Sequence, residues 1–532
     1  GTTTIVSVDS SGAQSAASPS GVKGSAISAD GNFVAFETAG TLVTGDGNGV
    51  ADVFVRDRVN NRTERVSTTA AGAEAPAGGA SNSRVDISAE GRYVVFESAD
   101  TTLVTPDAGG FVDVFRKDRT TGAIIRASQK SDGTQANASS ALTSGPVISP
   151  EGRFVAFPSA ASNLVSTSTD STPGNVDVFV HDAVSRQTVR VSEGSEANGP
   201  SNGPTLSAGS EAAFDSTATN LVTPDTNGAV SDIYARHFRR PVGSFVLDNV
   251  GGIFTFGTAT FRGSVPALRA AGTPVGSANI VDLEVTPSGN GYYVLDDAGG
   301  IFTFGDAGFF GSVPGLRASG VSIGPGRILD MAVTPTGLGY LILDDAGGIF
   351  AFGDATFFGS IPQLRAAGVA VGSARGVDLA MTPNGRGYLI LDDQGGIFTF
   401  GDGAFFGSLP GLRAAGVNIG SAPSIRMAIS PSGNGYLVLD SVGGMFTFGD
   451  AQFFGSIPGL RNAGVAIGNA AGVDLAMTPT GNGYVILDSQ GGMFTFGDGE
   501  FFGSIPQLRN AGVSIGPNSS IRVDLVSSLV GG

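Results

Sequence analysis

Two short segments have the residue spacing of a serine nucleophile. Gly320-Val321-Ser322-Ile323-Gly324 and Gly512-Val513-Ser514-Ile515-Gly516 match Gly-x-Ser-x-Gly, a turn that exposes a serine for acyl transfer. The same position in the other copies of this segment holds Pro274, Ala370, Asn418 and Ala466. The chain also has only two histidines, His181 and His237, that could serve as the base. We therefore expect no catalytic residues, and a secreted hydrolase is the last alternative.

A second group of residues could bind calcium. The segment Asp46-Gly47-Asn48-Gly49-Val50-Ala51-Asp52 offers oxygen atoms at alternate positions around a glycine turn, and Asp225, Asn227 and Asp232 repeat the pattern loosely. Calcium prefers hard oxygen ligands supplied by a tight loop. The alternative is that these side chains cap their own turns. The two histidines lie in different repeats and predict no metal site.

Carboxylates and arginines also recur in the second half of the chain. Both sets are spaced by 48 residues, and we expect them on one face of the fold. The carboxylates are Asp248, Asp296, Asp344, Asp392, Asp440 and Asp488; the arginines are Arg269, Arg317, Arg365, Arg413, Arg461 and Arg509. One interpretation is a set of Arg–Asp pairs that tie neighbouring units together. The other is a charged interaction face for a ligand or a protein.

The element that positions these residues is a 48-residue repeat. Gly251-Gly252-Ile253-Phe254-Thr255-Phe256-Gly257 returns in six copies, and a fixed period of this length indicates a radial or stacked repeat architecture. Each copy predicts three strands around a Gly-Gly hairpin, with a fourth strand beginning at a Phe-Phe pair such as Phe309-Phe310. The first strand missing from the start of this half is found at Arg522–Val526. We therefore predict a six-bladed β-propeller at 241–532, closed by its C-terminal strand.

A different repeat of about 60 residues occupies 1–240. Ser-x-[Asp/Glu]-Gly turns begin at Ser28, Ser88 and Ser149, with a degraded copy at Ser207. An Asp-Val-Phe-like strand and a further outer strand follow each turn. The outer strand of the fourth unit is missing after residue 237, and Thr4-Ile5-Val6-Ser7 matches it. We predict a four-bladed β-propeller that residues 4–7 close, either in their own ring or in a neighbour's.

These motifs resemble two known groups of repeats. The Ser-x-Asp-Gly-Arg-x-Val-Ala-Phe pattern of residues 1–238 resembles the PD40 repeat of TolB-like propellers, although its period is longer. The Gly-Gly-Ile-Phe-Thr-Phe-Gly-Asp-Ala-x-Phe-Phe-Gly-Ser pattern of 242–530 resembles repeats in secreted actinobacterial propeller proteins. The second resemblance implies an extracellular setting and no catalytic residue set.

The composition excludes several classes of function. The formal net charge is −17 with 14% charged residues, which argues against nucleic acid as a partner. No apolar run is long enough to predict a membrane span. Cysteine is absent, so disulfides and thiolate metal sites are excluded. The polar start at Gly1 leads us to expect a processed, exported bacterial protein with no cofactor other than calcium.

From these observations we expect a non-catalytic extracellular structural or adhesive protein. It would assemble into a surface layer, sheath or filament, through propeller faces or by exchange of a terminal strand between copies. Another cell-surface protein is the alternative partner. A carbohydrate or cell-wall binding module is the second function considered, and the absence of tryptophan disfavours it.

Overall fold

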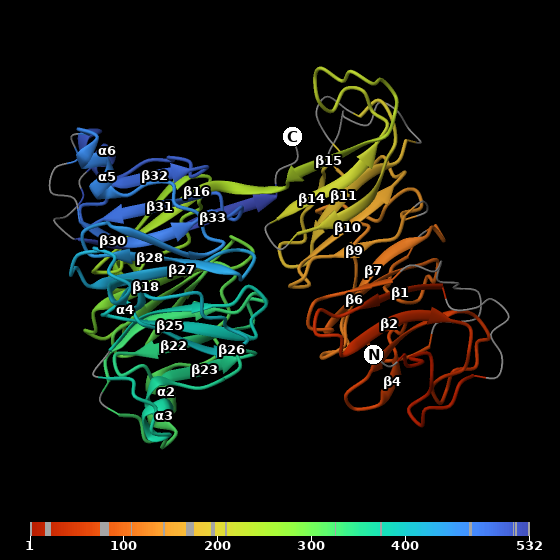
Figure 1. Cartoon of the computed structure of the whole chain (residues 1–532), viewed down its shortest axis with the longest axis horizontal. Coiled ribbons are helices and arrows are strands. Elements are labelled where there is room, and N and C mark those ends of the chain that lie inside the picture. Colours follow the sequence, from red (N-terminus) through yellow and green to blue (C-terminus); the bar gives the residue numbers. More distant parts are fainter. Residues whose placement is uncertain are drawn as a thin grey trace. The chain divides into compact units, whose positions relative to one another are not determined.

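The chain forms two compact units in a computed structural model, Gly1–Phe238 with Leu529–Gly532, and Arg239–Ser528. The structure describes residues 3–15, 23–74, 85–107, 109–141, 144–165, 175–192, 197–207, 210–324, 326–372, 375–465, 467, 471–513, 515 and 519–529. We call the two units unit 1 and unit 2. Both consist of small antiparallel sheets (Figure 1).

The described residues of unit 1 form four sheets, and each consists of strands consecutive in the chain. The first sheet is β1 (Lys23–Ile27), β2 (Phe33–Thr38), β3 (Asp52–Asp57) and β4 (Arg62–Arg65). The second is β5 (Val85–Ile87), β6 (Tyr93–Ser98), β7 (Asp113–Asp118) and β8 (Ile124–Arg126). The third is β9 (Val147–Ile148), β10 (Phe154–Ser159), β11 (Asp177–Asp182) and β12 (Thr188–Arg190). The fourth is β13 (Ser201–Leu206), β14 (Glu211–Ser216) and β15 (Asp232–His237).

The Ser-x-[Asp/Glu]-Gly turn sets the register of the first two strands in these sheets. The Ser28 hydroxyl donates to Asp30 (2.6 Å) and accepts from the backbone N–H of Phe33 (3.0 Å). Gly31 between them has φ +71°, which disfavours a side chain. The same bonds recur around Ser88. With the register fixed, apolar side chains on alternate faces form clusters between consecutive sheets.

Among the described residues, residues 4–7 do not close unit 1 within their own chain, which was one of the two predicted arrangements. The fourth sheet has three strands, and among the described residues no apolar cluster joins it to the first sheet. Val6 instead packs against the cluster of the first sheet that contains Phe36, and the Val8 carbonyl accepts from the Thr63 hydroxyl (2.5 Å). Figure 1 shows the N-terminus beside β2 and β4, with β15 at the other end of unit 1. The segment is thus held by the first sheet, at a distance from the edge that it was predicted to complete.

In the part of unit 2 that the structure describes there are six three-stranded sheets. One sheet combines β16 (Arg239–Asp248), β17 (Ile253–Gly257) and the C-terminal β33 (Ser520–Leu529). The next two are β18 (Ile280–Val285), β19 (Tyr292–Asp296), β20 (Ile301–Phe304), and β21 (Ile328–Val333), β22 (Gly339–Asp344), β23 (Ile349–Gly353). The last three are β24 (Gly376–Met381), β25 (Gly387–Asp392), β26 (Ile397–Gly401); β27 (Ser424–Ile429), β28 (Gly435–Asp440), β29 (Met445–Gly449); and β30 (Gly472–Met477), β31 (Gly483–Asp488), β32 (Met493–Gly497).

The C-terminal strand closes unit 2 as predicted. Val523 of β33 lies in an apolar cluster with Leu487 of the preceding sheet. Val526 lies in the cluster on the other side, with Leu283 and Val294 of the following sheet. The sheet built from both ends of unit 2 therefore packs against two neighbours, and the six sheets form a closed ring. This arrangement is an all-β propeller.

The predicted fourth strand of each 48-residue repeat is not a strand. After Phe309, the backbone is bonded to the next sheet: the Tyr340 hydroxyl donates to the Gly311 carbonyl (2.5 Å) and accepts from the Phe310 N–H (3.2 Å). These bonds replace a strand ladder, so the segment crosses between sheets. A short helix follows, begun by a Ser N-cap and a Pro in the first turn. The six helices are α1 (Val265–Ala270), α2 (Val313–Ala318), α3 (Ile361–Ala366), α4 (Leu409–Ala414), α5 (Ile457–Asn462) and α6 (Ile505–Asn510).

Candidate interaction surfaces

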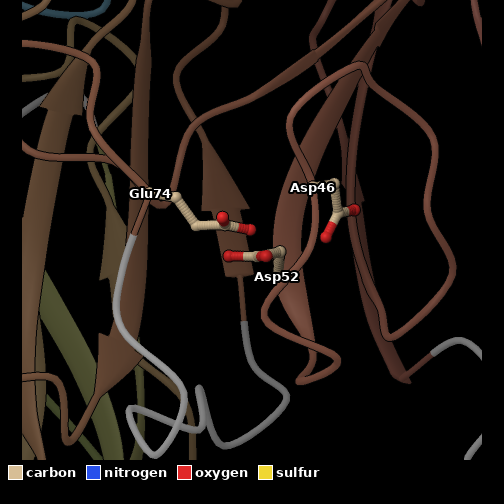
Figure 2. A group of neighbouring side chains, drawn as sticks. All are labelled: Asp46, Asp52 and Glu74. Atoms are coloured by element: carbon tan, nitrogen blue, oxygen red, sulfur yellow. The ribbon is translucent and has the colours of Figure 1, made fainter.

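The first predicted calcium site is built from three carboxylates and an arginine. Figure 2 shows Asp46, Asp52 and Glu74 directed toward one another, and their oxygens lie within 4.8 Å. The Arg65 guanidinium lies among them, with Nη1 2.5 Å from Glu74, 3.4 Å from Asp52 and 3.7 Å from Asp46. Burial raises the pKa of Asp46 and Asp52. The guanidinium takes the place that a cation would occupy, so calcium binding here would require Arg65 to move.

The same arrangement recurs in the next two sheets. Arg126 pairs with Asp107 (2.9 Å) and Asp113 (3.0 Å), and Arg190 pairs with Asp177 (3.2 Å). In each case the arginine is on the outer strand and the aspartate begins the third strand. The arginine is thus a regular part of a sheet in unit 1.

The second predicted calcium site is in the fourth sheet, which has no outer strand to supply an arginine. Asp225 Oδ1 accepts from the backbone N–H groups of Asn227 (3.1 Å) and Gly228 (3.2 Å), which is the turn-capping geometry. The Asn227 side-chain amide donates to Asp232 (3.1 Å). The three residues predicted to lie together do so, but their hydrogen bonds cap the turn, as in the alternative interpretation.

Replacing Arg65 with alanine is expected to create a calcium site. The three carboxylates would lose their shared cation, and a loop of hard oxygen ligands binds calcium with millimolar to micromolar affinity. We expect calcium to raise the melting temperature of the Arg65→Ala variant by a few degrees and to leave the parent unchanged, as measured by calorimetry. Arg62→Ala, at an exposed neighbouring arginine, is the control. Equal responses of the variant and the parent would contradict the assignment.

The six hairpin aspartates of unit 2 are each bonded to the backbone of their own hairpin. Asp296 Oδ1 accepts from the backbone N–H groups of Ala298 (3.0 Å) and Gly300 (2.7 Å), and each of the other five makes the same pair of bonds. The six arginines are exposed. Arg413 donates to the Gln394 carbonyl (3.0 Å) of its neighbouring hairpin. The two sets therefore share one side of the ring. One prediction was that they form Arg–Asp ion pairs between neighbouring repeats, whereas the aspartates bond to the backbone of their own hairpins.

A charged ring on the first strands of unit 2 was missed by the sequence analysis. Its members are buried or half-buried and spaced by 48 residues; they are Asp282, Asp330, Asp378, Arg426, Asp474 and Arg522. In the described strands β18, β21, β24, β27 and β30 a bulge precedes this position. The 48-residue spacing was the signal, but the position mixes Asp with Arg and no single residue type recurs.

Arg522 is bonded to carboxylates from several sheets at once. It pairs with Asp282 (2.5 Å), Asp474 (3.2 Å) and Asp330. Arg426 pairs with Asp474 (2.9 Å). A cavity of about 510 Å³ has Arg426 in its wall. The pairs with Asp282 and Asp474 join neighbouring sheets, and the Arg522–Asp330 pair joins two sheets that are not neighbours, so the charged ring ties unit 2 together across its centre.

The carboxylates of this ring also bond to the next sheet. Asp282 Oδ2 accepts from the Met331 N–H (2.8 Å), and Asp474 Oδ2 accepts from the Val523 N–H (2.6 Å). Asp330 and Asp378 make equivalent bonds. Asp524, two positions further along β33, bonds to Val285 and completes the circle. The carboxylates at the centre of unit 2 therefore join neighbouring sheets through hydrogen bonds.

Unit 2 is expected to lose stability as the pH rises. Burial raises the pKa of Asp524 to about 6, of Asp378 to about 7 and of Asp474 to about 8, against 3.8 for a free side chain. Between pH 3.8 and the raised pKa of each group, the folded state binds more protons than the unfolded state. The free energy of unfolding therefore falls as the pH rises through this range. We expect melting temperatures to decrease from about pH 5 to about pH 9. Asp378→Asn should flatten the slope, and a flat or rising profile of the parent would contradict the assignment.

Six exposed phenylalanines recur at one position of the 48-residue repeat in unit 2, and the sequence analysis assigned them to strands. They begin the segment that crosses between sheets, and their exposed fractions range from 42% to 60%. The six are Phe261, Phe309, Phe357, Phe405, Phe453 and Phe501. The residue after Phe309, Phe310, meets the Tyr340 ring edge to face (5.8 Å between centroids) and helps to fix the crossing. The preceding ring is left in solvent, once in each of the six repeats.

The Gly-x-Ser-x-Gly segments do not form a nucleophile elbow. Ser322 is exposed in an irregular loop after α2, and Ser514 lies outside the described residues. His181 belongs to unit 1 and is fully buried, with Nδ1 2.9 Å from the Thr188 hydroxyl. Burial lowers its pKa to about 4. Neither the turn nor a nearby base supports a serine hydrolase.

The sheet order defines the chain as an all-β protein of the β-propeller class. No protein-family profile and no curated protein matches the sequence. Among solved structures, Sqt1 from Chaetomium thermophilum is 11% identical with a TM-score of 0.28, covering 66% of this chain and 92% of that one. Sqt1 bound to the N-terminus of ribosomal protein L10 is 14% identical, with the same TM-score and coverage.

A further similar structure is the Cps50 (Swd1) β-propeller domain from Myceliophteria thermophila. It is 10% identical, with a TM-score of 0.23, and the match covers 80% of this chain and 96% of that domain. TM-scores this low carry no inference about function. In the described part of the chain, no helix has the length and apolar character that a bilayer crossing requires.

Proposed function

We propose that this chain is a non-catalytic structural or adhesive protein of the bacterial cell exterior that binds proteins, including other copies of itself. The observation that carries the proposal is the set of six exposed phenylalanines on unit 2. A large aromatic ring left in water lacks the stabilisation that burial would give it, and contact with a partner would supply that burial. Six equivalent rings around a closed circle suit lateral contact with several identical neighbours better than one small ligand.

The polar groups support the same proposal. The hairpin aspartates and the central charged ring are bonded within unit 2, as described above. The arginine–carboxylate clusters of unit 1 are likewise internal. What the molecule presents to a partner is therefore apolar rings and exposed arginines. The Ser-x-[Asp/Glu]-Gly turns support a relation of unit 1 to TolB-like propellers, and the unit 2 repeats support an extracellular location.

A cell-wall glycan is the second candidate partner. Exposed aromatic rings can stack on sugar rings, and a polymer of identical sugars could use several equivalent sites. The observation that favours it is the same set of phenylalanines, so an experiment must separate the two.

The test is light scattering and negative-stain imaging of the full chain. We expect concentration-dependent assemblies of the parent, and their loss when all six phenylalanines are replaced by serine. The control replaces five exposed valines, which also recur every 48 residues: Val321, Val369, Val417, Val465 and Val513. A parent that stays monomeric at every concentration, and whose monomer sediments with cell-wall polysaccharide, would overturn the proposal in favour of the glycan.

A further inference from the structure

We propose that the open edge of β15 is completed by residues 3–7 of a second copy of this chain. This inference rests on the self-association proposed above, and it names the partner and the contact. It concerns unit 1 alone and does not depend on the phenylalanines of unit 2.

A serine–aspartate pair shows which strand is missing from the fourth sheet. In the first sheet, Ser67 follows the outer strand, donates to Asp52 (2.6 Å) and accepts from the Val53 N–H (3.0 Å). Ser128 with Asp113 and Ser192 with Asp177 repeat the pair at 2.6 and 2.7 Å. In the fourth sheet the equivalent aspartate is Asp232, at the start of β15, and no outer strand follows.

The only matching serine in the sequence pattern is Ser7, sixty positions before Ser67. The isolated bridges confirm this offset, since Val8 pairs with Gln14 as Thr68 pairs with Glu74. Residues 3–7 therefore have the pattern of an outer strand. Among the described residues they are in no sheet.

The segment after residue 7 is already docked as a connector between sheets. Its Asp9 carbonyl accepts from Arg56 of the first sheet (3.0 Å). The connector after β4 makes the same contact with the second sheet, where Lys117 donates to the Thr69 carbonyl (2.9 Å). A connector in this position implies a preceding sheet beside the first one. Among the described residues of the single chain, no sheet occupies that position.

Apolar side chains at the two ends of unit 1 complement each other. Ile87 and Ile148 each face the preceding sheet and are 6% exposed, whereas Ile27, at the same position of the first sheet, is 58% exposed. Val53 and Val114 each face the following sheet and are fully buried. Ile233, at the same position of the fourth sheet, is 77% exposed.

Ile27 and Ile233 therefore hold the two positions that pack together between neighbouring sheets elsewhere in unit 1, but here, among the described residues, each lacks its partner sheet. The N-terminal segment of the same chain lies at the end of unit 1 opposite to β15 (Figure 1). A second copy, stacked head to tail, brings Ile27, the connector and residues 3–7 to β15 together. A head-to-tail contact of this kind uses different surfaces on each copy and builds rings or filaments. The added strand pairs through its backbone with an open sheet edge.

Engineered disulfides test this contact directly, because the chain has no cysteine. In the first sheet Arg56 lies opposite Thr63, and the same offsets place Arg236 opposite Thr3. We would prepare Thr3→Cys and Arg236→Cys as separate proteins, one carrying a size tag, and mix them under mild oxidation. We expect a mixed disulfide between two copies on non-reducing gels, and a ladder of oligomers from the double variant.

A register control distinguishes pairing from collision. Thr4→Cys mixed with Arg236→Cys is shifted by one residue and places the thiols on opposite faces, so little bond should form. The inference is overturned if the double variant forms only an internal disulfide, if no bond forms, or if the register control cross-links equally. If the cysteine variants assemble but form no bond between positions 3 and 236, the strand contact is overturned and the proposed function is unaffected. If no assembly forms at all, the proposed function is overturned as well.

Discussion

Replacing Arg522 with glutamine is expected to remove about 3–5 kcal/mol from the free energy of unfolding of unit 2. The arginine is buried at the centre of the ring and pairs with carboxylates of three other sheets. Glutamine is uncharged, so buried carboxylates would remain without a counter-ion. That state costs far more than the loss of an exposed ion pair. Urea denaturation near neutral pH, followed by circular dichroism, measures the difference.

Two controls make the result specific to the central charges. Arg327→Gln removes an arginine whose side chain is 56% exposed and which pairs with Asp297 at 3.4 Å; less than about 1 kcal/mol should be lost. The loss in Arg522→Gln should also shrink as the pH falls from about 9 to about 5, through the raised pKa values of Asp474 (about 8) and Asp378 (about 7), because a protonated carboxyl needs no counter-ion. Equal losses in the two variants, or a loss independent of pH, would show that the ring is not held by these charges.

The repeat spacing predicted much of the fold because it reports on local strand order. The Gly-Gly hairpins and the return of the first-strand pattern at Arg522–Val526 were sufficient to place β33 in the ring. The Phe-Phe segment was misassigned as a strand, although its apolar pattern fits one. What decides its conformation is the Tyr340 hydroxyl of the next sheet, an interaction that no local pattern reports.

The calcium prediction failed to consider a residue outside the loop. Arg65 is thirteen positions beyond Asp52, and the same spacing joins Arg126 to Asp113 and Arg190 to Asp177. Extending the pattern to the outer strand would have found this repeated pair. The fourth sheet has no such arginine, because the segment that matches the outer strand has Ile5 at the position of Arg65.

The position of residues 3–7 could not be derived from the comparison of the chain's own repeats alone. The sixty-residue offset identifies the kind of strand and its connector, and the structure agrees on the connector. Whether four sheets curve enough to meet depends on the packing between every pair of neighbouring sheets. In unit 2 six sheets close, and in unit 1 four leave two complementary ends apart.

Deleting residues 520–532 is expected to abolish the cooperative unfolding transition of unit 2. The deletion removes a whole strand, the Arg522 pairs and the apolar packing of Val523 on one side and Val526 on the other. Each buried valine contributes about 1.5–3 kcal/mol, and the edge of β16 that pairs with β33 would be left open. Together with the Arg522 pairs, the sum is comparable with the whole stability of a typical domain, about 5–15 kcal/mol. Circular dichroism melts and limited proteolysis of the full chain and the deletion variant measure the effect.

The matched comparison is deletion of residues 1–7, which removes a terminal segment that is in no described sheet. Unit 1 should keep its melting transition with only a small shift, because Val6 is the main apolar side chain that this deletion takes from the cluster of the first sheet. A synthetic peptide of residues 519–529 should restore the unit 2 transition to the C-terminal deletion. If both deletions were equally tolerated, β33 would not be the strand that closes the ring. If both were equally destructive, residues 3–7 would belong to the sheet of their own chain, and strand donation to a neighbour would have no free strand to use.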